Sequence, residues 1–262
     1  MKINIPSTAI MVTEKCTLRC KLCLAYSPYY SSYKTMDIEQ AKMTLNTYFQ
    51  MVDTVNKISI TGGEPLLNGD LGEIIREIYK YENQILDEII MVTNGTILLK
   101  ETLLQILKCN PKVKVIINNY GEISKYAEQN YQDLKKWDIR SVLYDENNRY
   151  GWIDCRNHDL KHKTERDKER QAQSCAFFQG KKYVINRGKL YTCTRSAYRI
   201  QENVIPYTEN DYIDLLDNDT DIMQKREKLF ALTKLKYTMS CAYCNGLIEN
   251  SKKYKAAEQL KS

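Results

Sequence analysis

The chain has 262 residues, enough for one large domain or two modest ones, and 43% of them are hydrophobic, as is usual in a globular protein. Its formal charge of +6 comes from 39 basic and 33 acidic residues that are interspersed. This argues against a nucleic-acid partner, because such proteins gather their basic residues into a patch or stripe. No run of about 18 apolar residues could span a bilayer and no signal peptide is recognisable, so we expect a cytoplasmic protein without membrane contact.

Short apolar strands alternate with amphipathic helices over residues 1–150. Strand–helix units repeated in this way indicate a parallel sheet. The loops after the strands would then share one edge of that sheet, where α/β barrels and open sheets both bind ligands. We predict strands at 9–12, 57–60, 88–93, 113–119 and 139–144, and helices at 38–52, 71–78, 103–107 and 122–136, where apolar residues recur three or four positions apart.

The pattern changes after residue 150. Residues 151–174 are polar, so we expect a connector there, and the mixed charges at 161–170 indicate a solvated helix or loop. Residues 175–250 predict a second, smaller α+β unit, with a hairpin that turns at Arg187 and Gly188 and a helix near 220–232. We expect the charged residues 251–262 to form a frayed tail.

Nine cysteines are unusual for a chain in a reducing compartment, where clustered cysteines indicate metal or redox chemistry rather than disulfides. Two stand alone, and we expect one of them, Cys109, to be a small buried hydrophobic residue. The other seven fall into two groups: a C-x3-C-x2-C group of Cys16, Cys20 and Cys23, and a dispersed group of Cys175, Cys193, Cys241 and Cys244.

The first cysteine group places three thiols in one loop, whereas a structural zinc site takes four ligands, normally as two close pairs. Three thiolates suit three irons of a four-iron, four-sulfur cluster and leave the fourth iron open to another ligand. A second motif, TGGEP at 61–65, directly follows the second predicted strand. Its two glycines permit close backbone approach to a ligand, its glutamate can accept from an ammonium group, and its proline fixes the turn.

Together these motifs resemble the radical S-adenosylmethionine (radical SAM) superfamily, in which a cysteine triad follows the first strand and a G-G-E-P turn follows the second. The resemblance implies an α/β fold in which residues 1–150 form a partial (β/α)6 TIM-type barrel. It also implies that the first cysteine group holds a four-iron, four-sulfur cluster whose open iron takes the amino and carboxylate groups of SAM. The cofactor-binding residues that it implies are Leu22, Gly62, Gly63, Glu64, Pro65, Asn94, Asn118 and Asn119.

Some of these positions have a second interpretation. Leu22 stands where the family usually has an aromatic residue before the third cysteine, and we expect it to pack against adenine. Asn94 precedes a glycine and could equally be a turn residue. The tyrosines at 26, 29 and 30 follow the cysteine loop and could pack in the core or within the loop.

The dispersed cysteines also have two interpretations. Four thiolates that include a C-x2-C pair would suit a structural zinc site. Their order and the segments GKLYTC (188–193) and CAYC (241–244) resemble the twitch domain, a shortened SPASM domain that follows the radical SAM barrel and binds an auxiliary four-iron, four-sulfur cluster. We favour the cluster, which would accept or relay an electron because all of its irons are ligated.

Residues between the two cysteine groups are candidates for substrate contact and catalysis. Arg149 best matches a substrate-contacting arginine of the superfamily's twitch-containing cyclitol dehydrogenases. Asp154 could orient a polar substrate or move a proton, and Cys155 could return a hydrogen atom, as a thiol does in radical SAM epimerases. The alternatives are a surface ion pair for Asp154 and a buried structural thiol for Cys155. His158 and His162 have no supporting motif and are expected at the surface.

The resemblance implies an enzyme that cleaves SAM reductively to a 5′-deoxyadenosyl radical, which takes a hydrogen atom from a substrate C–H bond. We expect oxidation or epimerisation of a small polar metabolite such as a sugar or cyclitol, with electrons from a flavodoxin- or ferredoxin-type reductant. One alternative is a peptide- or protein-modifying radical SAM enzyme that matures peptide natural products. Another is a non-catalytic zinc-binding interaction protein, which would leave the TGGEP motif unexplained.

Overall fold

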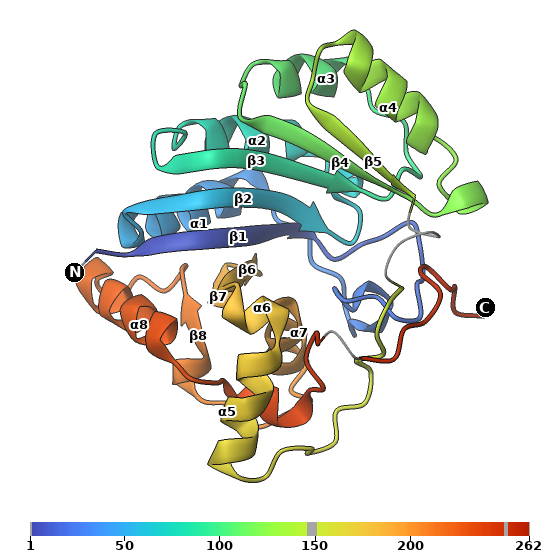
Figure 1. Cartoon of the computed structure of the whole chain (residues 1–262). Helices are drawn as coiled ribbons and strands as arrows, with labels where there is room; N and C mark the ends of the chain where they lie inside the picture. The colour runs from blue at the N-terminus through green and yellow to red at the C-terminus, as the bar shows by residue number, and fades with distance from the viewer. Residues whose placement is uncertain (1, 146–150, 249–250, 262) are drawn as a thin grey trace.

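A computed structural model describes residues 2–145, 151–248 and 251–261, and its centre is one eight-stranded sheet in the order β5-β4-β3-β2-β1-β6-β7-β8. The first six strands in that order are parallel, and the last two continue the sheet antiparallel (Figure 1). The strands are β1 (Asn4–Thr13), β2 (Thr54–Gly62), β3 (Ile85–Thr93), β4 (Val113–Asn119), β5 (Ser141–Asp145), β6 (Lys182–Asn186), β7 (Lys189–Tyr191) and β8 (Tyr212–Asp214). The helices are α1 (Ile38–Met51), α2 (Leu71–Tyr79), α3 (Glu101–Lys108), α4 (Ala127–Lys136), α5 (Glu165–Ser174), α6 (Ala176–Gln179), α7 (Thr194–Gln201) and α8 (Ile222–Lys234).

Helices α1 to α4 cover one face of the curved sheet (Figure 1). Burial alternates along β2, because successive side chains of a strand point to opposite faces, so Ile58 and Ile60 enter the core at 0% and 1% exposure. They meet the apolar side of α2, where Ile74 is fully buried. Asp37 caps the start of α1 by accepting a hydrogen bond from the backbone N–H of Gln40 at 2.8 Å. The predicted α/β core is confirmed.

The predicted hairpin does not form a separate sheet. Its first strand, β6, pairs in parallel with β1 from Ser7 opposite Lys182 to Ile10 opposite Ile185, and so extends the sheet of the first half. Its second strand pairs antiparallel with β8, which the sequence did not predict. The two parts of the chain therefore share one sheet, and the boundaries drawn at residues 150 and 174 remain a prediction.

The expected connector contains a helix. α5 occupies residues 165–174, begins at the capping residue Thr164, and carries ion pairs from Lys168 to Glu165 and from Arg170 to Asp167. Its sequence has almost no apolar periodicity, because little of its surface is covered and Ala172 is its buried residue. Hydrophobic patterning therefore missed it.

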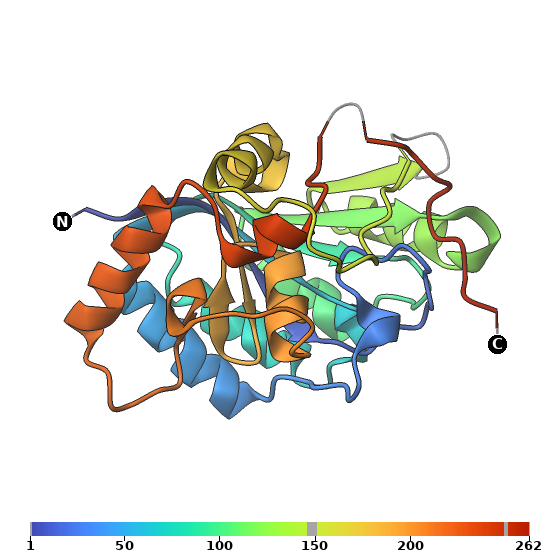
Figure 2. The ribbon, with the colours of Figure 1, turned by 90° about the horizontal axis from the view of Figure 1, so that it is seen from below.

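The segment 251–261 is not a frayed tail. The backbones of Tyr254 and Trp152 exchange two hydrogen bonds, of 2.7 and 2.8 Å, and residues 258–260 pair with the cysteine loop that follows β1. Figure 2 shows the segment running beside that loop. Long-range pairing, which local sequence does not encode, fixes it in place. Among the described residues, no helix combines the length and apolarity needed to cross a membrane.

Candidate functional site

The first cysteine group lies in the loop after β1, at the carboxyl edge of the parallel sheet. The TGGEP turn follows β2 at the same edge, and Asn94 follows β3. Cys16 Sγ accepts hydrogen bonds from the backbone N–H of Leu18 at 3.4 Å and from Asn94 Nδ2 at 3.5 Å. The fold thus brings together the triad, the TGGEP turn and Asn94, as the sequence predicted they would meet.

The two glycines of the turn are required by the cysteine loop itself. A Cβ on Gly62 would lie 2.2 Å from the carbonyl oxygen of Thr13, and one on Gly63 would lie 2.2 Å from that of Lys15. At these contacts Gly63 N–H donates to Thr13 and Glu64 N–H donates to Lys15, each at 2.8 Å. These N–H groups are therefore engaged within the protein. An incoming ammonium group, which can only donate hydrogen bonds, would meet the carbonyl oxygens of the turn.

The Glu64 carboxylate joins two of the loops at this sheet edge. Its carboxylate is fully buried and accepts from Leu66 N–H (3.2 Å), Thr93 Oγ1 (2.9 Å) and Asn94 N–H (2.8 Å), so it ties the turn after β2 to the end of β3. Burial raises the pKa of this carboxyl group. Both oxygens of Glu64 already have internal donors, which makes it a support for the site.

The remaining predicted cofactor residues line the same edge. Pro65 begins a short 3₁₀ turn and is buried, and Leu22 is 5% exposed. Asn119 Oδ1 accepts from Gly121 N–H at 2.9 Å, while Asn118, at the end of β4, is half-buried. Asn94 Oδ1 accepts from the backbone N–H of Thr96 at 3.0 Å, as a turn residue would.

Burial makes the first three thiols poor acids in the metal-free protein. It raises the pKa of Cys16 to about 11 and that of Cys20 to about 12, and it also raises the pKa of Cys23. Metal ligands must be thiolates, so a bound metal centre has to supply the positive charge that stabilises them.

The four dispersed cysteines line one cavity. Cys175 lies between α5 and α6, Cys193 caps the start of α7, and Cys241 and Cys244 belong to a 3₁₀ turn (Met239–Tyr243) and its end. Cys175, Cys193 and Cys244 each accept from a backbone N–H, at 3.4, 3.4 and 3.2 Å. Within the described ranges no three His, Cys, Asp or Glu side chains could share a single metal ion. The four thiols lie around the cavity rather than close enough together to bind one metal ion.

Arg195 provides a test of what that space can hold. The side chain is 4% exposed and lines the cavity; its Nη1 lies 3.7 Å from Cys244 Sγ, and its Nε and Nη2 have no hydrogen-bond partner in the described part of the chain. Although burial acts to raise the pKa of Cys244, the guanidinium groups of Arg195 and Arg199 hold it below its ordinary value. A buried cation with unpaired donors calls for an anion, and a cluster with four thiolate ligands carries net negative charge. The donor set fits a four-iron, four-sulfur cluster.

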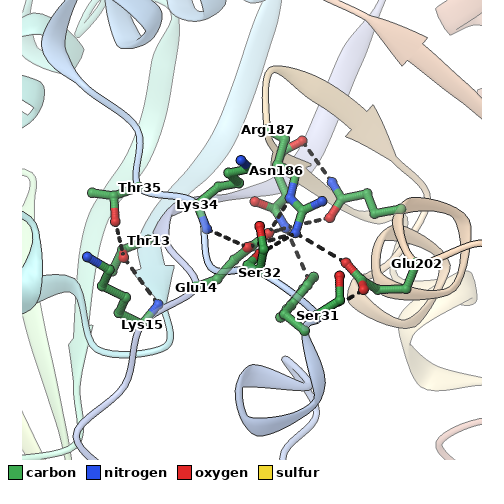
Figure 3. Close-up of polar contacts among 12 residues, drawn as sticks. Thr13, Glu14, Lys15, Ser31, Ser32, Lys34, Thr35, Asn186, Arg187 and Glu202 are labelled. Atoms are coloured by element: carbon green, nitrogen blue, oxygen red, sulfur yellow. Dashed lines mark hydrogen bonds and ion pairs between the residues drawn. The ribbon is translucent and has the colours of Figure 1, made fainter.

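An ion-pair network joins the cysteine loop to the hairpin. Glu14, two residues before Cys16, is fully buried and accepts from Arg187 Nε at 2.8 Å and Nη2 at 2.9 Å (Figure 3). Arg187 also pairs with Glu202, just after α7, at 3.2 Å. Cys193 caps the start of α7, so this network connects the first cysteine loop to the helix that carries one cysteine of the second group.

The substrate-side candidates have separate outcomes. Arg149 lies outside the described residues. Asp154 is held by Arg156 through bonds of 2.9 Å from Nε and 2.5 Å from Nη2, and the hydrogen bond from Arg156 lowers the pKa of Asp154. Cys155 packs against the tyrosine cluster, and its backbone carbonyl accepts from Tyr26 Oη at 2.6 Å. Burial raises the pKa of Cys155, and the neighbouring Arg195 acts against that rise.

Three expectations about other residues are decided by packing. Tyr26 and Tyr30 are buried and form a cluster with Tyr198, with Tyr29 packed against it. His158 and His162 are not simple surface residues: Arg199 Nε donates to His158 Nδ1 at 3.1 Å, and His162 Nε2 lies 3.1 Å from the carbonyl oxygen of Cys244. Cys109, expected to be buried, is exposed at the end of α3, where its thiol donates to the Gln105 carbonyl.

Sequence reasoning missed three residues of the site. Arg195 lies two residues after Cys193, and closeness to a candidate ligand could have drawn attention to it. Glu14 directly follows β1, but no motif marks its carboxylate as a partner of Arg187. Gln259 Nε2 donates to Cys20 Sγ at 3.3 Å across 239 positions of sequence, a distance over which no local pattern acts.

Comparison with known proteins finds a family match in the first half of the chain. Residues 10–121 match the family model described as the radical SAM superfamily. GTP 3′,8-cyclase of Sulfurovum sp. (strain NBC37-1) is 36% identical over 89 residues, which cover 34% of this chain and 27% of the relative. The same enzyme of Peptoclostridium acidaminophilum is 30% identical over 132 residues, covering 45% and 39%. The chain thus matches well under half the length of these curated relatives.

Solved structures resemble the whole chain. BtrN in complex with AdoMet and 2-DOIA aligns with a TM-score of 0.62 and 15% identity over 97% of this chain and 98% of BtrN. anSMEcpe with bound AdoMet aligns with a TM-score of 0.55 and 13% identity over 94% and 92%. At such identity the likeness shows the fold alone, here a parallel β/α core continued by antiparallel strands. The matched residues 10–121 contain the cysteine triad and the GGEP turn that meet at one sheet edge, so this part of the chain is similar to the radical SAM superfamily.

Proposed function

We propose that the chain is a radical SAM enzyme that uses an auxiliary four-iron, four-sulfur cluster to oxidise or epimerise a small polar metabolite. The observation that carries the proposal is the meeting of three thiols and the GGEP turn at one sheet edge, in a chain that also has a second site of four thiols and a buried arginine. Bound SAM and a reduced cluster would supply a 5′-deoxyadenosyl radical that removes a hydrogen atom from the substrate.

The chain's own residues would hold and orient these groups. Cys16, Cys20 and Cys23 would bind three irons, and the carbonyl oxygens of the TGGEP turn would accept from the ammonium of SAM. Glu64 would keep that turn against β3 through its three internal hydrogen bonds. Leu22 would pack against the adenine, and Asn118 or Asn119 would contact SAM from the end of β4.

The substrate side follows from charge and position. The hydrogen bond from Arg156 lowers the pKa of Asp154 and so favours its carboxylate form, which would accept a hydrogen bond from a hydroxyl or ammonium group rather than donate a proton. Arg149 would contact the substrate, and Cys155, close to both the tyrosine cluster and Arg195, would donate a hydrogen atom if the outcome is epimerisation. If the outcome is oxidation, the auxiliary cluster held by Cys175, Cys193, Cys241 and Cys244 would accept the electron, and a flavodoxin- or ferredoxin-type protein would supply the first one.

The substrate class is where the structural neighbours differ. BtrN, which aligns over nearly its whole length, was solved with 2-DOIA, and this favours a small polar molecule. anSMEcpe was also solved with the Cp18Cys peptide, in a structure that aligns with a TM-score of 0.51, so a peptide substrate is the second candidate. Deoxyadenosine formation measured against panels of amino-cyclitols, sugars and cysteine peptides would separate the two.

The test of the proposal begins with anaerobic reconstitution and counting of iron, acid-labile sulfide and zinc. We expect about eight irons per chain, and 5′-deoxyadenosine after SAM and dithionite are added. Cys16→Ala should abolish SAM cleavage, Cys241→Ala should lower the iron content to about four, and Cys109→Ser, at an exposed thiol, should change neither. Zinc at both sites, or no deoxyadenosine from the iron-loaded protein, would overturn the proposal.

A further inference from the structure

The C-terminal segment 251–261, here named the C-terminal strap, closes over the first cysteine loop. Resting on the proposed function, we infer that the strap is part of the first cluster's site, and that Gln259 is a positioning residue whose amide donates to the Cys20 thiolate and raises the reduction potential of that cluster. No motif in the sequence links the strap to the cysteine loop.

The strap is paired with the loop through its backbone. Lys21 N–H donates to the carbonyl of Glu258 at 2.7 Å, and Leu260 N–H donates to the carbonyl of Arg19 at 2.8 Å. These two bonds flank Cys20 and Gln259, which form an antiparallel bridge. The pairing thus places residue 259 opposite the middle cysteine of the triad.

The hydrogen bonds around Gln259 fix which way its amide faces. Arg19 N–H is a donor and lies 2.7 Å from the side-chain oxygen, so that atom must be the carbonyl Oε1. The amide nitrogen therefore faces Cys20 Sγ at 3.3 Å, and it also donates to the carbonyl of Ala257 at 2.6 Å. With the amide flipped, its NH2 group would face the Arg19 N–H, which is also a donor. The amide N–H group of Gln259 must therefore point toward the sulfur of Cys20.

The strap also keeps water away from this thiol. Cys20 is 6% exposed, and Ala256 and Ala257 are each buried to 6% exposure. The strap is anchored upstream by the paired backbones of Tyr254 and Trp152. In such a dry setting a single N–H···S bond interacts more strongly with the sulfur than it would in water.

The redox consequence follows from charge. When a cluster is reduced, the electron density on its thiolate ligands increases, so a donor to sulfur stabilises the reduced form more than the oxidised form. Removing the donor should therefore make the cluster harder to reduce. The effect should be confined to the cluster bound by the first cysteine group, because the second group lies in a separate cavity.

The test is Gln259→Glu in the full chain. This variant keeps an oxygen for Arg19 N–H, and so keeps the strap docked, but it puts a carboxylate where the N–H meets Cys20. Glu258→Gln is the matched control, because it alters only the exposed pair with Lys21, whose side chains are 37% and 49% exposed. The reduction midpoint of each is measured by titration followed by electron paramagnetic resonance, using the signal that changes when SAM is added.

We expect Gln259→Glu to lower the reduced-to-oxidised ratio of the first cluster at least tenfold at a fixed potential, equivalent to a midpoint about 59 mV more negative, with Glu258→Gln unchanged. Gln259→Met, which removes the donor without adding charge, should shift the midpoint in the same direction by less. Equal midpoints in all four proteins, or a shift in the control as large as in Gln259→Glu, would overturn the inference. Failure of the unaltered protein to assemble iron at the first cysteine group would overturn the proposed function as well, so the two failures are distinguishable.

Discussion

The close approach of the TGGEP turn to the cysteine loop predicts that Gly63→Ala damages the protein. The new Cβ would lie 2.2 Å from Lys15 O, 2.6 Å from Lys15 C and 2.7 Å from Glu14 O, all of them backbone atoms. Since contacts under 3.0 Å essentially never occur, the turn and the loop must separate by nearly 1 Å. The two 2.8 Å hydrogen bonds that join them, from Gly63 N–H and Glu64 N–H, would then be strained or lost.

The size of the effect can be estimated from these contacts. Each weakened hydrogen bond costs about 1 kcal/mol and overpacking costs about 1 to 3 kcal/mol, partly offset by about 0.5 kcal/mol from the stiffer unfolded chain. The net loss in the free energy of unfolding is about 2.5 to 4.5 kcal/mol. At about 2 to 4 °C per kcal/mol for a chain of this size, Tm should fall by about 10 °C.

Thermal unfolding of the reduced, metal-free protein, followed by circular dichroism, measures this prediction without any assumption about cofactors. Gly69→Ala is the matched control, because a Cβ there meets nothing within 4 Å, and it should leave Tm unchanged or slightly raised. A Gly63→Ala protein as stable as the Gly69→Ala protein would refute the reasoning. In the reconstituted protein, Gly63→Ala should also reduce iron bound by the first cysteine group, because the displaced loop carries Cys16.

Three further predictions rest on buried charges. Glu14→Gln leaves Arg187 without its bidentate carboxylate and should lower the free energy of chemical unfolding by about 3 kcal/mol. The control Asp138→Asn, at an exposed ion pair, should lower it by less than about 0.5 kcal/mol. Equal losses in the two variants would contradict this prediction. Burial and then Arg199 lower the pKa of His158 from 6.5 to about 4, with Lys161 acting in the same direction and Asp159 against it. Between these two pH values the unfolded state binds more protons than the folded state, so stability should fall as the pH drops from 6.5 toward 4. His158→Gln should flatten that part of the curve of Tm against pH. Parallel curves for the variant and the unaltered protein would rule this out. Arg195→Met removes the buried cation beside the four dispersed cysteines and should lower iron from about eight to about four per chain, with Arg195→Lys retaining more; full loading of the Met variant would contradict the proposed charge pairing.

Local patterns in the sequence were sufficient for the architecture of the first half. Apolar residues at helical or alternating spacing depend only on which face of an element is buried, so the strands β1 to β5 and the helices that cover them could be predicted in order. The charged run at 161–170 predicted a solvated helix or loop, and it could not decide for α5 because a solvated, charged helix has no apolar stripe. β8, a strand of three residues, is too short to show a pattern.

The candidate site divides in the same way. Cys16, Cys20 and Cys23 are close in sequence and TGGEP follows a strand, so topology alone brings them to one edge, and the sequence by itself was sufficient to show the resemblance to the radical SAM superfamily. Whether a polar side chain at that edge is free for a ligand or bonded within the protein depends on residues that are distant in the sequence. Tertiary structure alone brought Thr93 and Asn94 to the Glu64 carboxylate as donors and brought Gln259 to Cys20. These contacts join residues 29 to 239 positions apart, so they leave no trace in the spacing of nearby residues. Tertiary structure also left two N–H groups of Arg195 without a partner in the described part of the chain.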